Sequence, residues 1–256
     1  GMSAESYYTS PSALAAYLLL HYGGESDHPM GDFLPNGATR FPSACVHQTF
    51  DRKLGKNASR ALDLECAVGR SAFELSTFCD EVIGIDASSV FIEAANRLKR
   101  GDALVCEVPA QGVLTSPWKA VAPQTARRDR VAFEVGDAQA LRRDLGTFDV
   151  VLLANLLCRL PDPRACLRQL PALVRPGGQL VITTPSTWRE DYTPRAAWLG
   201  GYEDAQGPVR TLQGLHRALE PTFSLVKRLD LPLALREHER KYEVIIAEAS
   251  VGRRAA

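Results

Sequence analysis

Three features of the sequence predict an α/β fold with a doubly wound, mostly parallel seven-stranded sheet. Short apolar segments alternate with amphipathic ones between residues 60 and 184, as expected for strands joined by crossover helices. The segment FDVVLLA (148–154) is almost wholly apolar, which is typical of a strand buried on both faces. Near the end of the chain, two strand-like segments (223–231 and 242–251) are joined by a short charged connection without a helix. They predict an antiparallel hairpin at the sheet edge, with the last strand antiparallel.

The other elements follow in order along one expected domain of 256 residues. Ser10-Pro11 opens a helix that runs to Tyr22, because proline suits a first helical turn. Residues 23–44 are rich in glycine and proline and predict a loop, and residues 103–120 predict an inserted hairpin. We expect an N-terminal extension over 1–56 and a core over 57–251, with parallel strands at 60–64, 81–86, 131–135, 148–154 and 179–184, and helices at 69–78, 88–99 and 163–174.

The composition argues against several classes of protein. Lysine and arginine together number 30, as do aspartate and glutamate, so no net charge favours nucleic acid or an acidic membrane surface. No apolar stretch approaches the ~20 residues that span a bilayer. The six cysteines are scattered without metal-binding spacing, and the sequence shows no export signal. These features predict reduced thiols, a cytoplasmic location and no metal site.

Acidic residues end three successive strands of the predicted sheet. Asp63 begins DLECAVG (63–69), which turns through small residues into a helix, while Asp86 closes the next strand and Asp137 follows the third. At this edge of a parallel sheet, an acid can accept hydrogen bonds from ribose hydroxyls or an adenine amino group. Alternatively, each acid caps the helix that follows it. The three together predict a nucleoside-binding site.

These motifs resemble the class I S-adenosylmethionine-dependent methyltransferases, which have a Rossmann-like fold. The matching segments are ALDLECAVGRSAFEL (61–75), EVIGIDAS (81–88), FEVGDAQAL (133–141), FDVVLLANLLCRLPDP (148–163) and RPGGQLVITTP (175–185). The resemblance implies S-adenosylmethionine as the cofactor, with Asp63 and Gly69 at its methionine moiety, Asp86 at the ribose and Asp137 at the adenine. The residues that it places at the cofactor are Asp63, Glu65, Cys66, Ala67, Gly69, Ser71, Asp86, Ala87, Asp137, Ala138 and Asn155.

A dinucleotide-dependent oxidoreductase would use the same strand-turn-helix arrangement. Its G-x-G-x-x-G pattern is absent, because Glu65, Ala67 and Arg70 stand at the glycine positions. The methyltransferase pattern, acid-x-Gly-x-Gly-x-Gly, is also broken by Glu65 and Ala67. Alanine is a mild change, whereas the Glu65 carboxylate either points at the cofactor's ammonium or obstructs the pocket.

A narrower resemblance includes the N-terminal helix and points to the methyltransferase domain at the C-terminus of ovothiol synthases. It rests on YYTSPSALAAYLLLHYG (7–23), LECAVGRSAFEL (64–75), ANLLCRLPDP (154–163), TPSTWREDYTPRAAWLGG (184–201) and REHERKYE (236–243). That domain is associated with methylation of an imidazole nitrogen of 4-mercaptohistidine. The resemblance therefore implies a small histidine derivative as substrate and a functional pairing with an iron-dependent sulfoxide synthase.

Two segments outside the common motifs are expected to contact the substrate. The turn at 235–242 is rich in basic side chains that can hold a carboxylate, although such a turn can also be a solvated surface. Residues 187–201 predict either an aromatic lid that excludes water or packing against the N-terminal helix. A neutral imidazole has a lone pair, so no strong base is required and none is assigned. The expected substrate contacts are Tyr8, Asn155, Trp188, Arg236, His238, Arg240 and Tyr242.

Overall fold

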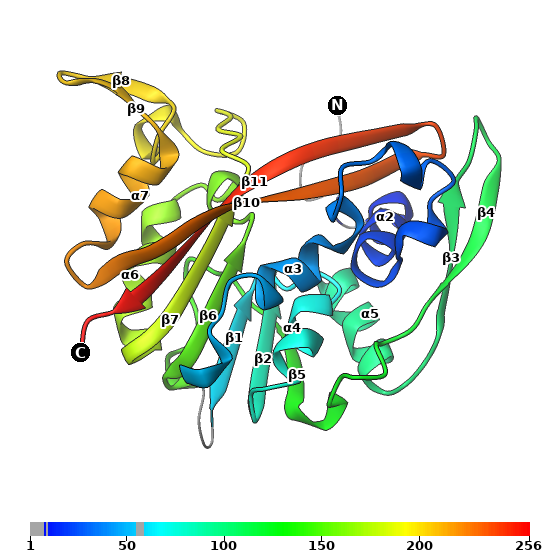
Figure 1. The fold of residues 1–256 in the computed structure, drawn as a ribbon, viewed down its shortest axis with the longest axis horizontal. Helices are drawn as coiled ribbons and strands as arrows, with labels where there is room; N and C mark the ends of the chain where they lie inside the picture. The colour runs from blue at the N-terminus through cyan, green and yellow to red at the C-terminus, as the bar shows by residue number, and fades with distance from the viewer. Residues whose placement is uncertain (1–7, 9, 55–58) are drawn as a thin grey trace.

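The computed structural model describes residues 8, 10–54 and 59–256, arranged around one seven-stranded sheet (Figure 1). Its strand order is β10-β11-β7-β6-β1-β2-β5. Five neighbouring strands are parallel, while β11 is antiparallel to both β7 and β10. This confirms the predicted mostly parallel sheet with an antiparallel last strand. The strands of the sheet are β1 (Arg60–Leu64), β2 (Glu81–Asp86), β5 (Val131–Val135), β6 (Phe148–Ala154), β7 (Val174–Thr184), β10 (Phe223–His238) and β11 (Lys241–Arg254).

Helices cover both faces of the sheet and enclose two apolar cores. Along β6, Val150 and Leu152 point into one core, whereas Val151 and Leu153 point into the other. This alternation explains why the whole strand is apolar. The first core packs against α2 (Pro11–Tyr22), α3 (Phe41–His47), α4 (Arg70–Leu75) and α5 (Ser89–Lys99), and the second against α6 (Pro163–Leu173) and α7 (Thr211–Leu219).

Two hairpins meet above the N-terminal helices. β10 and β11 are longer than predicted, and their far ends leave the sheet and pass over α2 and α3 (Figure 1). They reach the predicted insertion, which forms β3 (Leu104–Pro109) and β4 (Thr115–Ala120). The Glu239 amide donates to the Ala110 carbonyl at 3.2 Å, and the Arg236 guanidinium donates to the Pro109 carbonyl at 2.7 Å. The N-terminal helix α2 is therefore contacted by two hairpins from distant parts of the sequence.

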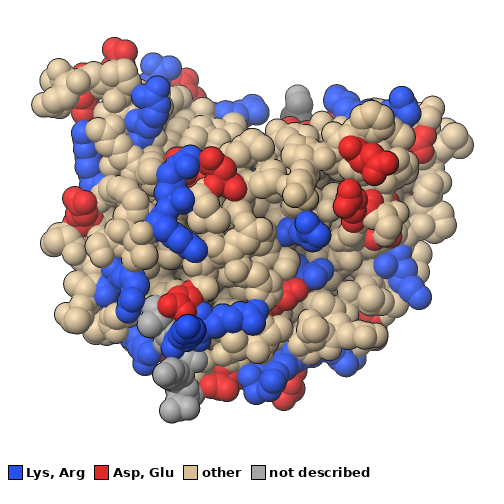
Figure 2. Space-filling view, in the orientation of Figure 1, with Lys and Arg blue, Asp and Glu red and all other residues tan. Residues whose placement is uncertain are grey.

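The prediction of a continuous loop over 23–44 is wrong at its end, because α3 begins at Phe41. Pro42 suits the first turn of this short helix, which buries Phe41, Cys45 and Val46 in the first core. The helix α7 and the small hairpin of β8 (Tyr202–Asp204) and β9 (Gly207–Val209) were not predicted. Among the described residues, no helix has the length and apolar character needed to cross a membrane. Basic and acidic side chains are interspersed over the face shown in Figure 2.

Candidate active site

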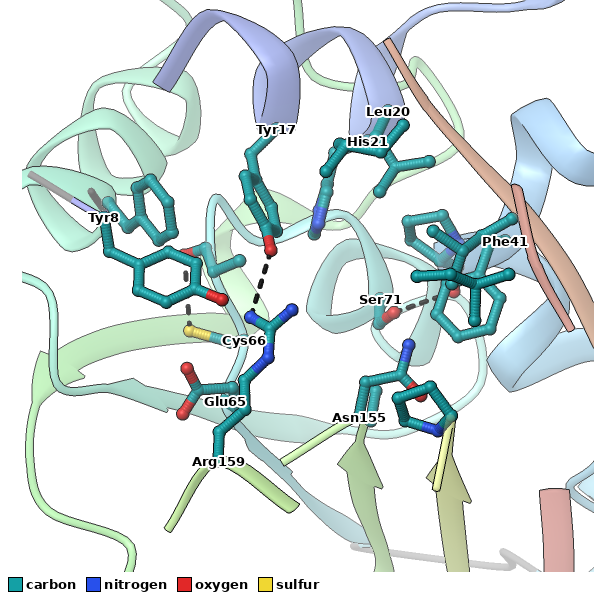
Figure 3. Close-up of a pocket in the computed structure, with 18 of the residues that line it drawn as sticks. Tyr8, Tyr17, Leu20, His21, Phe41, Glu65, Cys66, Ser71, Asn155 and Arg159 are labelled. Atoms are coloured by element: carbon teal, nitrogen blue, oxygen red, sulfur yellow. Dashed lines mark hydrogen bonds between the residues drawn. The ribbon is translucent and has the colours of Figure 1, made fainter. Parts of the chain in front are cut away.

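A cavity of about 800 Å³, counting its open mouth, lies at the carboxyl edge of the parallel strands (Figure 3). The turns that follow β1 and β6 form its floor. The N-terminal cover, which we define as Tyr8, α2 and α3, forms one wall together with Phe91 of α5, and the β10–β11 hairpin forms another. Its lining residues are Tyr8, Tyr17, Leu20, His21, Phe41, Pro42, Asp63, Glu65, Cys66, Ala67, Ser71, Phe91, Ala154, Asn155, Arg159, Pro185, Leu233, Leu235, Glu243 and Ile245.

The turn after β1 keeps a glycine-like backbone although two of its glycines are missing. Glu65, Ala67 and Gly69 all have positive φ, at 65°, 46° and 96°. A side chain is disfavoured there, since the left-handed conformation costs a non-glycine residue about 1–2 kcal/mol. At position 69 glycine is also needed for space, because a Cβ would lie 2.6 Å from the Phe133 ring. The turn has therefore retained its shape at some conformational cost.

Three carboxyl groups, from Asp63, Glu65 and Asp86, gather at this turn. Asp63 and Asp86 are buried, and Glu65 is partly buried and lines the cavity. Burial raises the pKa of Asp63 and of Glu65 well above the usual range, and the neighbouring Asp86 carboxylate adds to both effects. Asp86 accepts from the backbone amides of Ala67 and Ser88, both at 2.8 Å, and lies within hydrogen-bonding reach of Glu65. Burial and the neighbouring Asp86 carboxylate therefore favour the protonated form of Glu65.

One oxygen of this cluster has no partner. Asp63 Oδ2 is buried without a hydrogen bond to any described residue. A buried, unpaired carboxylate oxygen is costly and calls for a cation or a donor. No three His, Cys, Asp or Glu side chains in the described part of the chain are placed to hold a metal ion. The unpartnered Asp63 oxygen can accept a hydrogen bond from a charged N–H donor such as an ammonium group.

Polar groups of other kinds face the cavity from opposite sides. Asn155, after β6, accepts from the Thr183 hydroxyl through Oδ1 at 2.8 Å, which leaves its amide N–H groups as donors. His21 of α2 accepts from the Arg70 amide through Nδ1 at 3.1 Å, so its proton is on Nε2. Burial, with the nearby Arg70 charge, lowers the His21 pKa to about 3. His21 is therefore a neutral donor, and the pocket holds it in one tautomer.

Arg159, in the short helix η7 (Leu157–Arg159), brings a positive charge into the cavity. Its guanidinium donates to the Tyr17 hydroxyl at 3.3 Å and lies 5.0 Å from the centre of the Tyr8 ring (Figure 3). The Tyr17 ring in turn packs 5.1 Å from the Phe91 ring. This corner of the cavity joins an aromatic wall to a group that can bind a carboxylate.

The structure brings together seven of the residues expected at the cofactor or substrate. Asp63, Glu65, Cys66, Ala67, Ser71, Asn155 and Tyr8 all line the cavity. Asp86 lies just behind it, bonded to the Ala67 amide. Gly69, Ala87, Asp137 and Ala138 do not line it; Asp137 is exposed beyond β5, where it accepts from the Gln139 amide at 2.8 Å.

The basic side chains of the β10–β11 hairpin lie away from the cavity, contrary to their expected role. Leu233 and Leu235 line the cavity, and because strand residues alternate between faces, Arg236 points to the opposite side. There it binds Pro109, while Tyr242 lies 3.0 Å from the His28 ring nitrogen. His238 and Arg240 occupy the turn and also lie outside the cavity lining; the Arg240 guanidinium lies 3.6 Å from the Met30 sulfur.

Trp188 also lies outside the cavity. The segment after β7 turns toward α7, where the Trp188 indole N–H donates to the Thr211 hydroxyl at 2.8 Å. Its ring stacks on Trp198 with centroids 6.4 Å apart. The predicted aromatic lid is instead part of the packing around α7, so this placement does not support a substrate contact by Trp188.

Sequence reasoning missed several cavity residues, chiefly Tyr17, His21, Phe91 and Arg159. Arg159 stands in NLLCRLPDP (155–163), four residues after the predicted Asn155, so its position past a strand end was an available signal. No comparable signal marked His21, because its helix is buried over most of its circumference and the pattern does not reveal which side faces the cavity.

Comparison with known proteins identifies the family. The family described as "Methyltransferase domain" matches residues 37–222. The chain belongs to this family of methyltransferase domains. The predicted enzyme class, an S-adenosylmethionine-dependent methyltransferase, and the predicted cofactor are thereby confirmed at family level.

Curated relatives match part of this methyltransferase. It is 30% identical over 125 residues to 27-O-demethylrifamycin SV methyltransferase of Amycolatopsis mediterranei (strain S699), covering 48% of this chain and 37% of that protein. It is 24% identical over 164 residues to methyltransferase GfsG of Streptomyces halstedii, covering 64% and 49%. The chain therefore spans half or less of the length of these relatives.

Solved structures share the fold at low identity. N-methyltransferase NodS from Bradyrhizobium japonicum WM9, in complex with S-adenosyl-L-homocysteine, has a TM-score of 0.52 and 15% identity, covering 96% of this chain and 100% of that one. Magnesium protoporphyrin IX methyltransferase from Synechocystis PCC 6803, with bound S-adenosylmethionine, has a TM-score of 0.55 and 14% identity, covering 98% and 95%. The [4+2]-cyclase SpnF reaches 0.58 with 15% identity, covering 100% and 97%.

Proposed function

We propose that this chain transfers the methyl group of S-adenosylmethionine to a small polar molecule, and that the acceptor is an imidazole nitrogen of 4-mercaptohistidine. The observation that carries the proposal is that one cavity is lined both by acids at the end of β1 and by aromatic side chains of the N-terminal cover. An iron-dependent sulfoxide synthase would supply such an acceptor. The narrower sequence resemblance includes α2, which contributes Tyr17 and His21 to that wall.

The cavity residues fit the cofactor at its methionine end. The unpartnered Asp63 Oδ2 would accept from the ammonium group, and the Asn155 amide would donate to the carboxylate. When bound, S-adenosylmethionine supplies an electrophilic methyl group on a sulfonium. The chain's own contribution is to hold the acceptor in line and to exclude water, which the cover and the hairpin side chains Leu233 and Leu235 would do.

The same cavity offers recognition for a histidine derivative. Arg159 would bind the amino-acid carboxylate, and the Tyr8 and Tyr17 rings would stack on a planar imidazole. The neutral His21, with its proton on Nε2, would donate to a polar atom of the acceptor and so select its orientation. A neutral imidazole nitrogen then attacks with its own lone pair, without a strong base.

The test is incubation with methyl-labelled S-adenosylmethionine and 4-mercaptohistidine, with histidine as the control acceptor. We expect label in a product of 4-mercaptohistidine and little in histidine. Asp63→Asn should weaken S-adenosylhomocysteine binding by about 1.5–3 kcal/mol, the contribution of a hydrogen bond to a charged group. Arg159→Gln should raise KM strongly for the amino acid but not for its decarboxylated analogue. Equal use of both analogues by the unaltered protein would contradict the carboxylate role of Arg159.

An oxygen acceptor is the second candidate. It is favoured by the relatives themselves, which include 27-O-demethylrifamycin SV methyltransferase and a ubiquinone biosynthesis O-methyltransferase of Coxiella burnetii. Labelling of a phenolic or hydroxylated acceptor, with none of 4-mercaptohistidine, would favour this candidate. A cofactor-binding module without catalysis would bind S-adenosylhomocysteine and label neither.

A further inference from the structure

Glu65 occupies a position where its backbone favours glycine and its side chain enters the cavity. Its φ of 65° is left-handed, and the amides of Glu65 and Cys66 both donate to the Ile85 carbonyl, at 2.8 and 3.0 Å. The turn is thereby fixed against the end of β2, so the side chain cannot leave the cavity through a simple backbone change. Figure 3 shows the carboxyl group beside Cys66, on the cavity side of the turn.

The partner of that carboxyl group is the acid that the cofactor's ribose would need. Asp86 ends β2, accepts from the amides of Ala67 and Ser88, and has the Glu65 carboxyl as its side-chain hydrogen-bonding neighbour. Two ionised carboxylates at hydrogen-bonding distance repel each other, so one must carry a proton and donate it. A protonated carboxyl presents an O–H donor to Asp86, as a ribose hydroxyl does.

We propose that Glu65 is an internal substitute for the cofactor's ribose hydroxyls, which occupies Asp86 until the ligand displaces it and thereby sets the affinity of the site. This inference rests on the proposed cofactor. Ribose binding exchanges one O–H···carboxylate bond for another, so Asp86 contributes little net affinity. Because Asp63 Oδ2 has no described partner, no internal bond must be broken there, and the methionine end of the ligand contributes its full binding free energy. Glu65 is thus an affinity-determining residue rather than a catalytic one.

The test compares two glycine substitutions in the same turn. Glu65→Gly removes both the side chain and the backbone strain, while Ala67→Gly, at a φ of 46°, relieves strain without removing any carboxyl group. Titration calorimetry with S-adenosylhomocysteine should show at least about tenfold tighter binding for Glu65→Gly and a change below about threefold for Ala67→Gly. Glu65→Gln still offers an N–H donor to Asp86 and should stay within about threefold of the unaltered protein.

A second readout uses the nucleoside alone. The preference for adenosine over 2′,3′-dideoxyadenosine should be small in the unaltered protein and about tenfold larger in Glu65→Gly, because only the variant leaves Asp86 open to the hydroxyls. Weaker or unchanged S-adenosylhomocysteine binding by Glu65→Gly would overturn the proposal, as would equal gains for both glycine variants. Absence of binding by every variant, each checked for folding by circular dichroism, would overturn it as well.

The proposal and the proposed function fail in different ways. Tight binding by Glu65→Gly with no methyl transfer to any acceptor supports the internal substitute and contradicts the enzyme. Methyl transfer by the unaltered protein, with affinity indifferent to Glu65→Gly, supports the enzyme and contradicts the internal substitute.

Discussion

Acidification should destabilise the N-terminal cover through one residue, His21. Its ring is buried between α2 and the start of α4, where Nδ1 accepts from the Arg70 amide and the Arg70 guanidinium donates to the His21 carbonyl at 2.8 Å. Protonation at Nδ1 would remove that acceptor and place a second positive charge beside Arg70. The folded protein therefore resists protonation of this ring, and burial lowers its pKa from 6.5 to about 3.

The size of the effect follows from the difference in proton uptake between the folded and unfolded chains. A lowered pKa contributes stability that is fully present above pH 6.5 and is lost as the pH falls toward 3. Between pH 7.5 and pH 5 the unfolded chain binds this proton and the folded chain does not. About 1.5 pH units at about 1.4 kcal/mol each predict a loss of about 2 kcal/mol in the free energy of unfolding.

The measurement compares His21→Asn with the unaltered protein in urea denaturation at both pH values. Asparagine offers an acceptor oxygen at the position of Nδ1 and does not titrate, so the bond to Arg70 can persist. All other ionisable groups are common to both proteins and cancel in the difference. The unaltered protein should lose about 2 kcal/mol more than the variant over this range. If the free energy of unfolding fell equally in both proteins between pH 7.5 and pH 5, the buried, neutral state of His21 would be refuted.

Three further outcomes are expected. Gly69→Ala should lower the free energy of unfolding by about 2–5 kcal/mol in urea denaturation, because a Cβ there is strained and lies 2.6 Å from the Phe133 ring; a loss below about 1 kcal/mol would contradict this. The raised pKa of Glu65 contributes stability that is present below pH 4.5 and lost as the pH rises, so Glu65→Gln should flatten the decline in the free energy of unfolding above pH 4.5. Identical slopes of this free energy against pH in the two proteins would argue against a protonated Glu65 in the folded protein. Trp188→Phe should reduce thermal stability by about 1 kcal/mol through the lost bond to Thr211 while leaving S-adenosylhomocysteine affinity, measured by calorimetry, unchanged; a large loss of affinity would return Trp188 to the site.

Most of the parallel sheet could be predicted from the sequence because β1, β2 and β6 are buried on both faces, whereas β5, at the edge, is partly exposed. β1, β2, β5 and β6 have the predicted bounds, since each is a short, mostly apolar segment between polar or turn residues. The hairpin of β10 and β11 could not be bounded in this way. Its outer part leaves the sheet, and exposed apolar side chains such as Val244 and Ile246 stand among charged ones. No local pattern shows where its pairing ends.

The candidate site was predictable where backbone motifs define it and unpredictable where tertiary packing does. Asp63 and Asn155 follow from their places at strand ends, and both line the cavity. Arg236 was expected to contact the substrate, but the alternation along β10 puts Leu235 in the cavity and turns Arg236 to the other side. A shift of one position along the strand moves a side chain to the other face. Which face borders the cavity depends on the segments that pack against the strand, and the strand's own sequence does not show it.

The meeting of the two hairpins has a consequence for how such a protein can change its substrate. Two walls of the cavity are built from an N-terminal helix and a C-terminal hairpin, braced by the inserted hairpin of β3 and β4, and none of these supplies the strand-end acids. Substitutions or length changes in these peripheral pieces would reshape the cavity walls and leave the acids in place. Conversely, the N-terminal helix and the two hairpins contact one another, so replacing one of them alone would remove contacts on which the other two depend. A graft from another protein should therefore carry all three as a unit.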